Sequence, residues 1–387
     1  MAGIIVKPRA RILQGHDWVF HSEILKVYGN PEEGSVVAIK DGKDKMLGSG
    51  IFNSKSQIVA RRFSRGRDIL DRDFFEKRLR RAISLRERRH ANSQFHRLVW
   101  SESDGLPGLI VDRYDDVMVL QTLALGMDIH KGVIAEILSS LPGIRAVIER
   151  NDTGARLAEG LPQQAGVLLG QTDGRVTLVN DGCRYEVDLL SGHKTGYYLD
   201  QMENHRSVAA YAKDRKVLDC FSNQGAFALA CMRNGATSAL ALESSADCVE
   251  KIRENAKLNE VAVSVEEGDV FDYLPNAGRR GLEFDLVILD PPSFTKAKGS
   301  THAALRGYRE LHLRAAKLLS KNGILATFSC SHHIGAQDFL ETVRAGLNDA
   351  RRSAHLVESL LQPADHPVLL AMPETEYLKG FIFEMVG

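Results

Sequence analysis

The stretch KVLDCFSNQGAFAL, residues 216–229, has the pattern of a strand that ends in a turn and continues as a helix. Further strand-like runs follow, and the gaps between most of them are long enough for a helix. These runs are 238–243, 262–266, 284–290 and 323–330, with a late pair near 354–360 and 378–385. Strands that alternate with helices predict an open parallel sheet that is covered by helices on both faces.

Two smaller parts precede this sheet. Residues 4–63 hold short alternating runs that are broken by turn residues, which predicts a small β domain. Residues 95–185 alternate strand-like runs with one helical segment, which predicts a small α+β domain. We therefore expect a multidomain α/β chain whose C-terminal domain is doubly wound and Rossmann-like. The expected domains are 1–72, 73–188 and 189–387.

The composition is that of a globular protein with balanced charge. Hydrophobic residues make up 44% of the chain, and 50 basic residues equal 50 acidic ones. The sequence has neither the apolar core of a signal peptide nor the roughly 18 uninterrupted apolar residues of a transmembrane helix, so we expect a cytoplasmic protein without a membrane partner. The five cysteines include no Cys-x-x-Cys pair, which argues against disulfides and against a metal site.

One segment departs from this balance. Residues 61–90 carry twelve basic residues against five acidic ones, and their apolar residues recur near helical spacing. This pattern predicts an amphipathic helix with an arginine-rich side. That side is either a solvated charged face or a surface that contacts nucleic acid.

Ligands of a doubly wound sheet bind just beyond the carboxyl ends of its strands. The turn after the first strand offers only Gly225, whereas a dinucleotide site requires G-x-G-x-x-G. A ligand without phosphate, such as S-adenosylmethionine, fits this turn better. Asp219 precedes the turn, Glu243 is placed to accept the ribose hydroxyls, and Asp269 is placed to accept the adenine amino group while Val270 packs on the ring. One acid after a strand usually caps a helix or a turn, but three in register favour a cofactor site.

The fourth strand ends in DPPSF, residues 290–294. Two prolines make this loop rigid, so its polar groups stay available to a planar substrate. Asp-Pro-Pro is typical of methyltransferases that act on nucleobases. It is also compatible with transfer to an exocyclic amino nitrogen, so the methylated atom stays open.

Cys330 ends the fifth strand, which neighbours the fourth in a doubly wound sheet, so Cys330 and Asp290 should flank one pocket. A cysteine at the end of a buried strand is by itself more typical of packing. Beside Asp290, however, it suits methylation of cytosine carbon 5, which needs a thiolate to add at carbon 6 and an acid to protonate ring nitrogen 3. We predict Cys330 and Asp290 as catalytic residues.

Segments along the whole chain resemble one known family. GHKTGYYLDQMENHR, LDCFSNQGAFAL, DLVILDPPSFTKAK and ADHPVLLAMPETEYLKGF look like the bacterial 23S ribosomal RNA cytosine-C5 methyltransferases with an N-terminal PUA domain. The resemblance implies an enzyme with a PUA-like domain, a class I methyltransferase domain, S-adenosylmethionine as cofactor, ribosomal RNA as partner, and a homodimer as a possible assembly. It places the cofactor around Asp219, Phe221, Ser222, Asn223, Gln224, Gly225, Ala226, Glu243, Ser244, Asp269, Val270 and Asp290. Its candidate RNA contacts are Arg61, Arg62, Lys194, Pro291 and Pro292.

The chain departs from the family pattern in two segments. Met202 and His205 stand where arginine is expected, and Asn223, Gln224, Gly225 and Ala226 stand where a Tyr-Thr-Gly-Gly-like run is expected. The target nucleotide therefore stays open. One alternative is a ribosomal RNA methyltransferase that modifies guanine or an exocyclic amine without a cysteine nucleophile. A second alternative is a non-catalytic RNA-binding protein with a vestigial methyltransferase fold.

Overall fold

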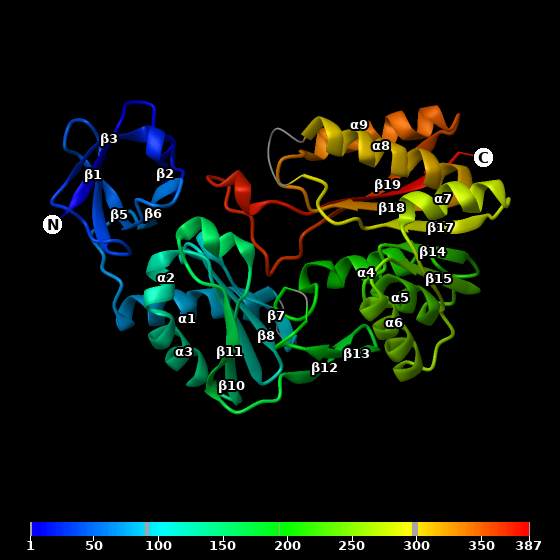
Figure 1. Cartoon of the computed structure of the whole chain (residues 1–387), viewed down its shortest axis with the longest axis horizontal. Coiled ribbons are helices and arrows are strands. Elements are labelled where there is room, and N and C mark those ends of the chain that lie inside the picture. Colours follow the sequence, from blue (N-terminus) through cyan, green and yellow to red (C-terminus); the bar gives the residue numbers. More distant parts are fainter. Residues whose placement is uncertain (1, 90–92, 193, 296–300, 387) are drawn as a thin grey trace. The chain divides into compact units, whose positions relative to one another are not determined.

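The computed structural model of the protein describes residues 2–89, 93–192, 194–295 and 301–386. The chain divides into two compact units (Figure 1). Unit 1 comprises Met1–Leu178, Glu186–Leu199 and Ala364–Glu376, and unit 2 comprises Val179–Tyr185, Asp200–Pro363 and Tyr377–Gly387.

Unit 1 begins with a six-stranded sheet in the order β2-β6-β5-β4-β1-β3. Its strands are β1 (Gly3–Val6), β2 (Trp18–Phe20), β3 (Ile24–Tyr28), β4 (Val36–Lys40), β5 (Met46–Phe52) and β6 (Ile58–Ser64). A small apolar core around Ile4, Val37 and Val59 holds them together. The predicted N-terminal β domain is thereby confirmed.

A second sheet of unit 1 has the strand order β11-β10-β9-β8-β7. Its strands are β7 (Phe95–Trp100), β8 (Leu109–Tyr114), β9 (Val117–Thr122), β10 (Ala146–Asn151) and β11 (Gln164–Gly170). Three helices belong to the same part of the chain: α1 (Arg72–Arg89), α2 (Leu125–Ile129) and α3 (Lys131–Ser139). After β11 the chain forms a separate two-stranded sheet of β12 (Arg175–Asn180) and β13 (Cys183–Asp188). Phe75 and Leu79 of α1 are buried in a core that Val111 and Leu120 of the sheet share.

The basic segment 61–90 does not form one helix. Residues 58–64 pair with β5 and β2 as strand β6, and the helix begins only at Arg72. β6 lies between β2 and β5 in the sheet, and five of its seven residues are buried. Arg61 and Arg62 therefore belong to the first sheet and not to the amphipathic helix.

Unit 2 is built on a seven-stranded sheet in the order β16-β15-β14-β17-β18-β20-β19. Its strands are β14 (Lys216–Cys220), β15 (Ser238–Glu243), β16 (Ser264–Glu267), β17 (Phe284–Leu289), β18 (Leu319–Ser329), β19 (Ala354–Leu361) and β20 (Lys379–Met385). The first five are parallel, whereas β20 runs antiparallel to both β18 and β19. This topology confirms the predicted doubly wound sheet with a late strand pair.

Helices cover both faces of this sheet (Figure 1). They are α4 (Met202–Ala209), α5 (Ala226–Arg233), α6 (Ala246–Leu258), α7 (Val270–Arg279), α8 (Thr301–Leu318) and α9 (Ala336–Asp349). Leu218 of β14 points into the core beneath α7, α8 and α9, and its neighbour Val217 points into the core beneath α4 and α5. Because both faces are buried, the strands are almost continuously apolar. No helix in the described ranges is long and apolar enough to span a membrane.

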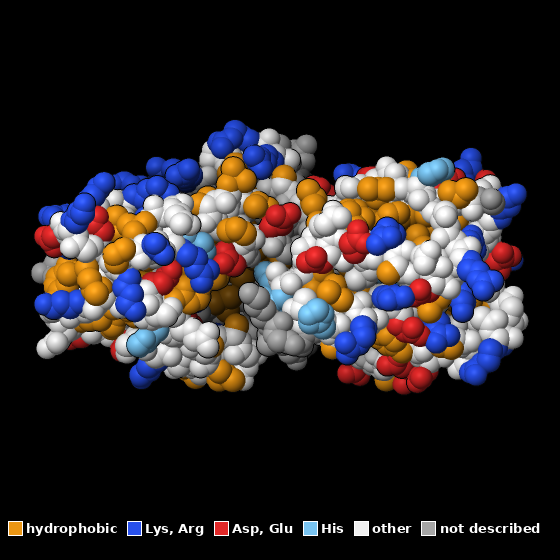
Figure 2. All heavy atoms as spheres, turned by 90° about the horizontal axis from the view of Figure 1, so that it is seen from above, with side chains coloured by type: hydrophobic (Ala, Val, Ile, Leu, Met, Phe, Trp, Pro, Cys, Tyr) orange, Lys and Arg blue, Asp and Glu red, His pale blue; other side chains and the backbone are white. Residues whose placement is uncertain are grey.

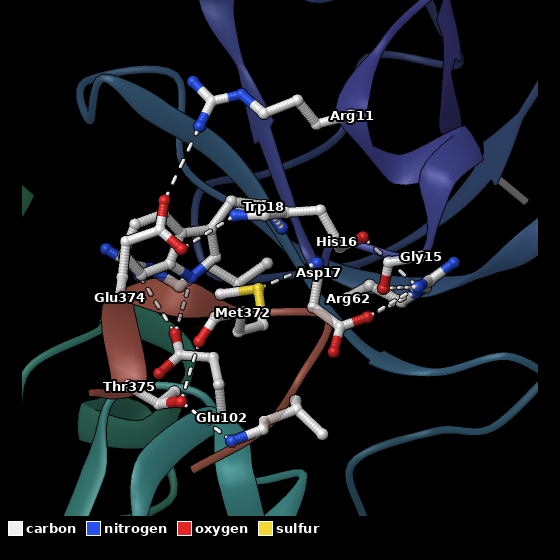
Figure 3. Close-up of polar contacts among 12 residues, drawn as sticks. Arg11, Gly15, His16, Asp17, Trp18, Arg62, Glu102, Met372, Glu374 and Thr375 are labelled. Atoms are coloured by element: carbon white, nitrogen blue, oxygen red, sulfur yellow. Dashed lines mark hydrogen bonds and ion pairs between the residues drawn. The ribbon is translucent and has the colours of Figure 1, made fainter.

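The connection between β19 and β20 contributes residues 364–376 to unit 1 (Figure 3). The imidazole Nε2 of His16 lies 3.1 Å from Glu374 Oε2, and the Asp17 amide donates to the sulfur of Met372. Trp100 Nε1 donates to the Thr375 carbonyl at 3.2 Å. This connection is therefore held by the first sheet and by β7.

Candidate functional site

The candidate site residues of unit 2 follow the carboxyl ends of its parallel strands. Cys220, the last residue of β14, pairs with Leu242 of β15 and with Leu289 of β17. Leu289 in turn pairs with Thr327 of β18. This register brings the segments that begin at Phe221, Glu243, Asp290 and Phe328 to one edge of the sheet.

The turn after β14 is tightly curled. Phe221, Asn223 and Gly225 have φ of 60°, 51° and 82°, which is the left-handed region. Non-glycine residues are uncommon there, and such conformations cluster at ligand sites because the surroundings hold them. The Asn223 amide donates to Glu243 Oε2 at 2.9 Å, and the Gly225 amide donates to the Ser222 carbonyl at 2.8 Å.

Asp219 is buried beneath this turn and holds it in place. Its Oδ2 accepts hydrogen bonds from Ser222 Oγ at 2.6 Å and from the Ala228 amide at 3.1 Å, which ties the turn to the first turn of α5. Burial, together with the nearby charge of Glu243, raises the pKa of Asp219 to about 7. The structure thus gives Asp219 a positioning contact with the turn.

Two acceptor atoms near the turn have no hydrogen-bond partner among the described residues. They are Asp219 Oδ1 and Gln224 Oε1, and both are buried. A buried acceptor without a donor costs free energy, on the order of 1–3 kcal/mol. The ammonium group of S-adenosylmethionine is a donor, so this cofactor fits the residues present.

Glu243 is fixed at the end of β15 by three backbone amides. Its Oε1 accepts from the amides of Ser244 and Ser245 at 2.8 and 3.0 Å, and its Oε2 accepts from the Asn223 amide. Each carboxylate oxygen has two lone pairs, so Oε2 keeps acceptor capacity for a ligand hydroxyl.

Asp269 and Val270 lie where β16 passes into α7. Asp269 is exposed, and its Oδ1 accepts from the Phe271 amide at 2.7 Å as the N-cap of the helix. Val270 is buried in the core of unit 2. Asp269 Oδ2 has no hydrogen-bond partner among the described residues, so one oxygen can cap the helix while the other accepts from a ligand.

Asp290 is held by a chain of two amides that the sequence analysis did not identify. Gln201 Nε2 donates to Asp290 Oδ2 at 2.9 Å, and Asn204 Nδ2 donates to Gln201 Oε1 at 2.6 Å. Both amide side chains are buried. Because Gln201 Oε1 is occupied as an acceptor of the Asn204 bond, Nε2 is the group that faces Asp290. The motif LDQMEN was visible in the sequence, but the pairing of Gln201 with a residue 89 positions away was not.

Cys330 is the one cysteine of the chain that is not fully buried, and all five lie in the described ranges. Burial raises the pKa of Cys220 and of Cys231 well above the ordinary value for a thiol. Such thiols are inert packing groups. The partial exposure of Cys330 sets it apart from them.

A network of hydroxyl groups joins the two serines on either side of Cys330 to α8 and to the Asp-Pro-Pro loop. Tyr308 on α8 lies with its hydroxyl 3.0 Å from Ser329 Oγ and 3.3 Å from Ser331 Oγ, and Ser331 Oγ lies 3.0 Å from Ser293 Oγ of the Asp-Pro-Pro loop. Burial raises the pKa of Tyr308, and the charges of Cys330 and Asp290 raise it further. Both candidate catalytic residues therefore lie within electrostatic range of one buried hydroxyl. Pro291 of this loop is buried and Pro292 is exposed.

A buried cation adjoins the same segment. Lys379, the first residue of β20, pairs with Ser329 in the sheet, and its Nζ donates to the Ser331 carbonyl at 2.7 Å. The segment 329–331 is thus bonded to both Tyr308 and Lys379. In the sequence, nothing but a lysine near the end of the chain indicated that Lys379 would contact this segment.

The candidate RNA contacts of unit 1 differ in exposure. Lys194 is exposed, has φ of 53°, and lies with its Nζ 4.1 Å from the centre of the Tyr198 ring. The next residue, Thr195, donates to Asp112 Oδ2 at 2.6 Å and so anchors the loop.

Arg61 and Arg62 face the interior of unit 1. Arg61 forms ion pairs with Glu102 at 3.2 Å and with Glu159 at 2.9 Å, and Arg62 Nε donates to Asp17 Oδ1 at 2.7 Å. The Arg62 side chain is only 4% exposed. Their burial and their acidic partners argue against an RNA contact through either side chain.

Two family models match the chain. A PUA-like domain matches residues 4–65, and an S-adenosylmethionine-dependent methyltransferase matches residues 162–383. The second match contains all of the unit 2 site residues described above, and S-adenosylmethionine is the cofactor of that family.

Related proteins cover the chain almost completely. The chain is similar to "Ribosomal RNA large subunit methyltransferase I" of Tolumonas auensis, with 37% identity over 97% of this chain and 96% of the relative. The protein of the same name from Aeromonas hydrophila is 36% identical and is matched over 98% of both chains.

Solved structures agree in fold. A SAM-dependent methyltransferase from Streptococcus mutans superposes with a TM-score of 0.85 at 21% identity, covering 99% of this chain and 100% of the other. A methyltransferase complexed with SAH gives a TM-score of 0.86 at 22% identity, with the same coverage.

Proposed function

Because the chain belongs to the S-adenosylmethionine-dependent methyltransferase family, in the branch that includes the ribosomal RNA large subunit methyltransferase I proteins, we propose that it methylates large-subunit ribosomal RNA. We further propose that the product is 5-methylcytidine and that Cys330 is the nucleophile. The observation that carries this proposal is the partly exposed Cys330 in a segment that is bonded to the Asp-Pro-Pro loop through Ser331 and Ser293.

The chemistry begins with an attack on the base. The thiolate of Cys330 adds to carbon 6 of cytosine while Asp290 donates its proton to ring nitrogen 3, so carbon 5 becomes an enamine-like nucleophile. S-adenosylmethionine, when bound, supplies the electrophilic methyl group. After carbon 5 has taken this methyl group, a base removes the carbon 5 proton and the bond between carbon 6 and the cysteine sulfur breaks. The proton on nitrogen 3 then returns to Asp290.

Gln201 sets the side of Asp290 from which this proton leaves. Since Gln201 Nε2 donates to Oδ2, that oxygen is an acceptor and the acidic proton resides on Oδ1. We therefore assign Gln201 as a positioning residue for Asp290, and Asn204 as the residue that orients Gln201.

The residues proposed to contact the cofactor lie at the carboxyl ends of the strands or just after them. In this proposal Asp219 Oδ1 and Gln224 Oε1 accept from the cofactor ammonium, Glu243 accepts from the ribose hydroxyls, and Asp269 Oδ2 accepts from the adenine amino group. The curled turn at Phe221–Gly225 shapes the space for the methionine end. Lys194, Pro291 and Pro292 are proposed to contact the RNA.

The substrate base must leave its stack, because carbon 6 cannot be reached inside a helix. The test uses tritiated S-adenosylmethionine and large-subunit ribosomal RNA transcribed without modification. Wild type, Cys330→Ala and the control Cys183→Ala, which removes a fully buried thiol, are compared and the product nucleosides are separated. We expect label in 5-methylcytidine with wild type and the control, and none with Cys330→Ala.

A second arm detects the covalent step. RNA that carries 5-fluorocytidine has no carbon 5 proton to remove, so the adduct should persist and survive denaturing electrophoresis with wild type and Cys183→Ala but not with Cys330→Ala. Label in another nucleoside, unaffected by Cys330→Ala, would refute the cysteine mechanism and favour transfer to guanine or to an exocyclic amine. Absence of any label, despite cofactor binding by calorimetry, would favour a vestigial methyltransferase fold.

A further inference from the structure

The helix α1 lies in a part of the chain that neither family model covers. The PUA-like match ends at residue 65 and the methyltransferase match begins at residue 162. The basic segment begins at Arg61, inside the PUA-like match, but the helix begins at Arg72, after that match has ended. No function is assigned to α1 by either match.

The arginines of this segment include two contrasting groups. In one group the guanidinium is buried and its charge is balanced by an acidic partner. Arg86 is 1% exposed, pairs with Asp104 at 2.6 Å and donates to the carbonyls of Arg97 and Asp365. Arg61 and Arg62 belong to the same group. These side chains stabilise unit 1 and are not available to a partner.

The second group is exposed and has no acidic partner among the described residues. It consists of Arg65, Arg67, Arg80, Arg81, Arg88 and Arg89. The last four lie on α1, and we call them the α1 arginine surface. Arg80 and Arg88 are two turns apart, with Ser84 between them, and Ser84 Oγ accepts a hydrogen bond from Arg88. On the face drawn in Figure 2, Lys and Arg side chains gather in clusters, so the neutral total charge conceals local excesses.

Most acids of the same segment are already engaged. Asp73 pairs with Lys77 at 2.9 Å, and Glu76 lies 3.6 Å from Arg72. Asp71 caps the helix at the Phe74 amide, and Asp68 accepts from Ser64. Glu87 is the one acid of the helix without a hydrogen bond or ion pair to a described residue, so the six exposed arginines outnumber the acids left to balance them.

The cations are close enough to repel one another. Arg78, between the helix surface and the first sheet, donates to the Phe63 carbonyl at 3.1 Å. Burial lowers the pKa of Arg78, and the charge of Arg81 lowers it further. The charges of Asp68 and Asp17 act in the opposite direction. Arg78 and Arg81 are thus close enough to repel each other, and a bound polyanion would reduce this repulsion.

The side chains of the α1 arginine surface favour a nucleic-acid backbone over an acidic protein as the anionic partner. The apolar residues Phe74, Phe75, Leu79 and Ala82 of α1 are buried, so its arginine face lacks the apolar centre of a typical protein interface. Arginine forks match phosphate oxygens in bidentate geometry, and exposed guanidinium groups release counterions from a nucleic-acid backbone.

We propose that the α1 arginine surface binds the sugar-phosphate backbone of the RNA substrate, outside the PUA-like match and independently of base sequence. This inference rests on the proposed function, which supplies RNA as the partner. It replaces Arg61 and Arg62 as the RNA contacts of the basic segment. It predicts an electrostatic contribution to RNA affinity and none to the chemical step.

The experiment compares two double variants of the full-length protein. Arg80→Gln/Arg81→Gln removes two arginines without acidic partners, and Arg72→Gln/Lys77→Gln removes two exposed cations of the same helix that are paired with acids. Affinity for unmodified large-subunit ribosomal RNA transcript is measured between 0.05 and 0.3 M salt. Each lost phosphate contact should reduce the slope of log affinity against log salt by roughly 0.7–0.9.

For Arg80→Gln/Arg81→Gln we expect a slope smaller by about 1.4–1.8 and affinity weaker by on the order of tenfold at 0.1 M salt. The control variant should keep the wild-type slope within about 0.5. Equal slopes for both variants and wild type would overturn the proposal. Cofactor affinity and turnover at saturating RNA separate this failure from failure of the proposed function, since they concern unit 2 and should be unchanged in both variants.

Discussion

The Oγ atoms of Ser293 and Ser331 lie 3.0 Å apart, and this contact joins the Asp-Pro-Pro loop after β17 to the residue that follows Cys330. Two segments that are 38 residues apart thus share one hydrogen-bond network, which Tyr308 extends to Ser329. This network links the loop that begins at Asp290 to the residues on either side of Cys330. Three predictions rest on the contacts around these two residues and the candidate cofactor turn, and a fourth concerns two buried histidines of unit 2.

Removal of the Tyr308 hydroxyl should loosen the link between the loop and the strand end. Tyr308→Phe leaves Ser329 and Ser331 with one partner fewer, so we expect a loss of about 1–2 kcal/mol in the free energy of unfolding and a roughly tenfold lower kcat. The control is Tyr273→Phe, because the buried Tyr273 hydroxyl has no hydrogen-bond partner among the described residues. Denaturant unfolding and methyl-transfer assays measure both, and equal effects of the two variants would contradict the role of the network.

Loss of the Gln201 amide should impair the chemical step and spare binding. Gln201→Leu removes the donor to Asp290 Oδ2, so kcat should fall by about ten- to a hundredfold while KM for RNA and the affinity for S-adenosylmethionine stay within about twofold. Gln201→Glu places a second carboxylate beside Asp290 and raises the pKa of the pair. The basic limb of the pH–rate profile should therefore move to higher pH. A wild-type profile in both variants would show that Gln201 does not position Asp290.

Exchange of Glu243 for its amide should weaken cofactor binding. In Glu243→Gln one acceptor oxygen becomes an NH₂ group that faces the amides of Ser244 and Ser245 or of Asn223, all of which are donors. We expect a Kd for S-adenosylmethionine at least tenfold higher by calorimetry. Glu267→Gln is the matched control, because Glu267 ends the neighbouring strand β16, pairs with Glu243 in the sheet and is exposed. An unchanged Kd for Glu243→Gln would remove Glu243 from the cofactor site.

Acid should destabilise unit 2 through its buried histidines. Burial lowers the pKa of His312 and of His205 to about 3 from an ordinary 6.5. Because the pKa in the folded state is lower than in the unfolded state, the unfolded chain binds the proton first. The contribution to stability is complete above pH 6.5 and is lost as pH falls toward 3, at about 1.4 kcal/mol per pH unit for each histidine.

The variant His312→Asn should reduce the slope of unfolding free energy against pH by about one proton between pH 6 and pH 4. The exposed His355→Asn serves as control and should leave the slope unchanged. Urea unfolding at several pH values measures both. A slope that does not differ between His312→Asn and wild type would mean that His312 is not the titrating group.

The sheet of unit 2 was predictable because its signal is local. Apolar runs such as 238–243 and 284–289 and the turn formers at 222–225 lie within single elements, and the observed strands agree with them to within a few residues. The convergence of Asp219, Glu243, Asp269 and Asp290 also followed, since parallel neighbours in a doubly wound sheet present their carboxyl ends at one edge.

The sequence by itself therefore determined the fold class and the place of the turn after β14, and it suggested Asp290 and Cys330 as candidates. Only the tertiary structure decided which of these side chains are exposed and what holds them. Arg61 and Arg80 lie in one basic run, yet Arg61 is paired with Glu102 and Glu159 while Arg80 is exposed. Likewise, the bonds from Gln201 to Asp290 and from Lys379 to Ser331 join residues 89 and 48 positions apart. Burial and such long-range pairs depend on how the whole chain packs, which no local pattern records.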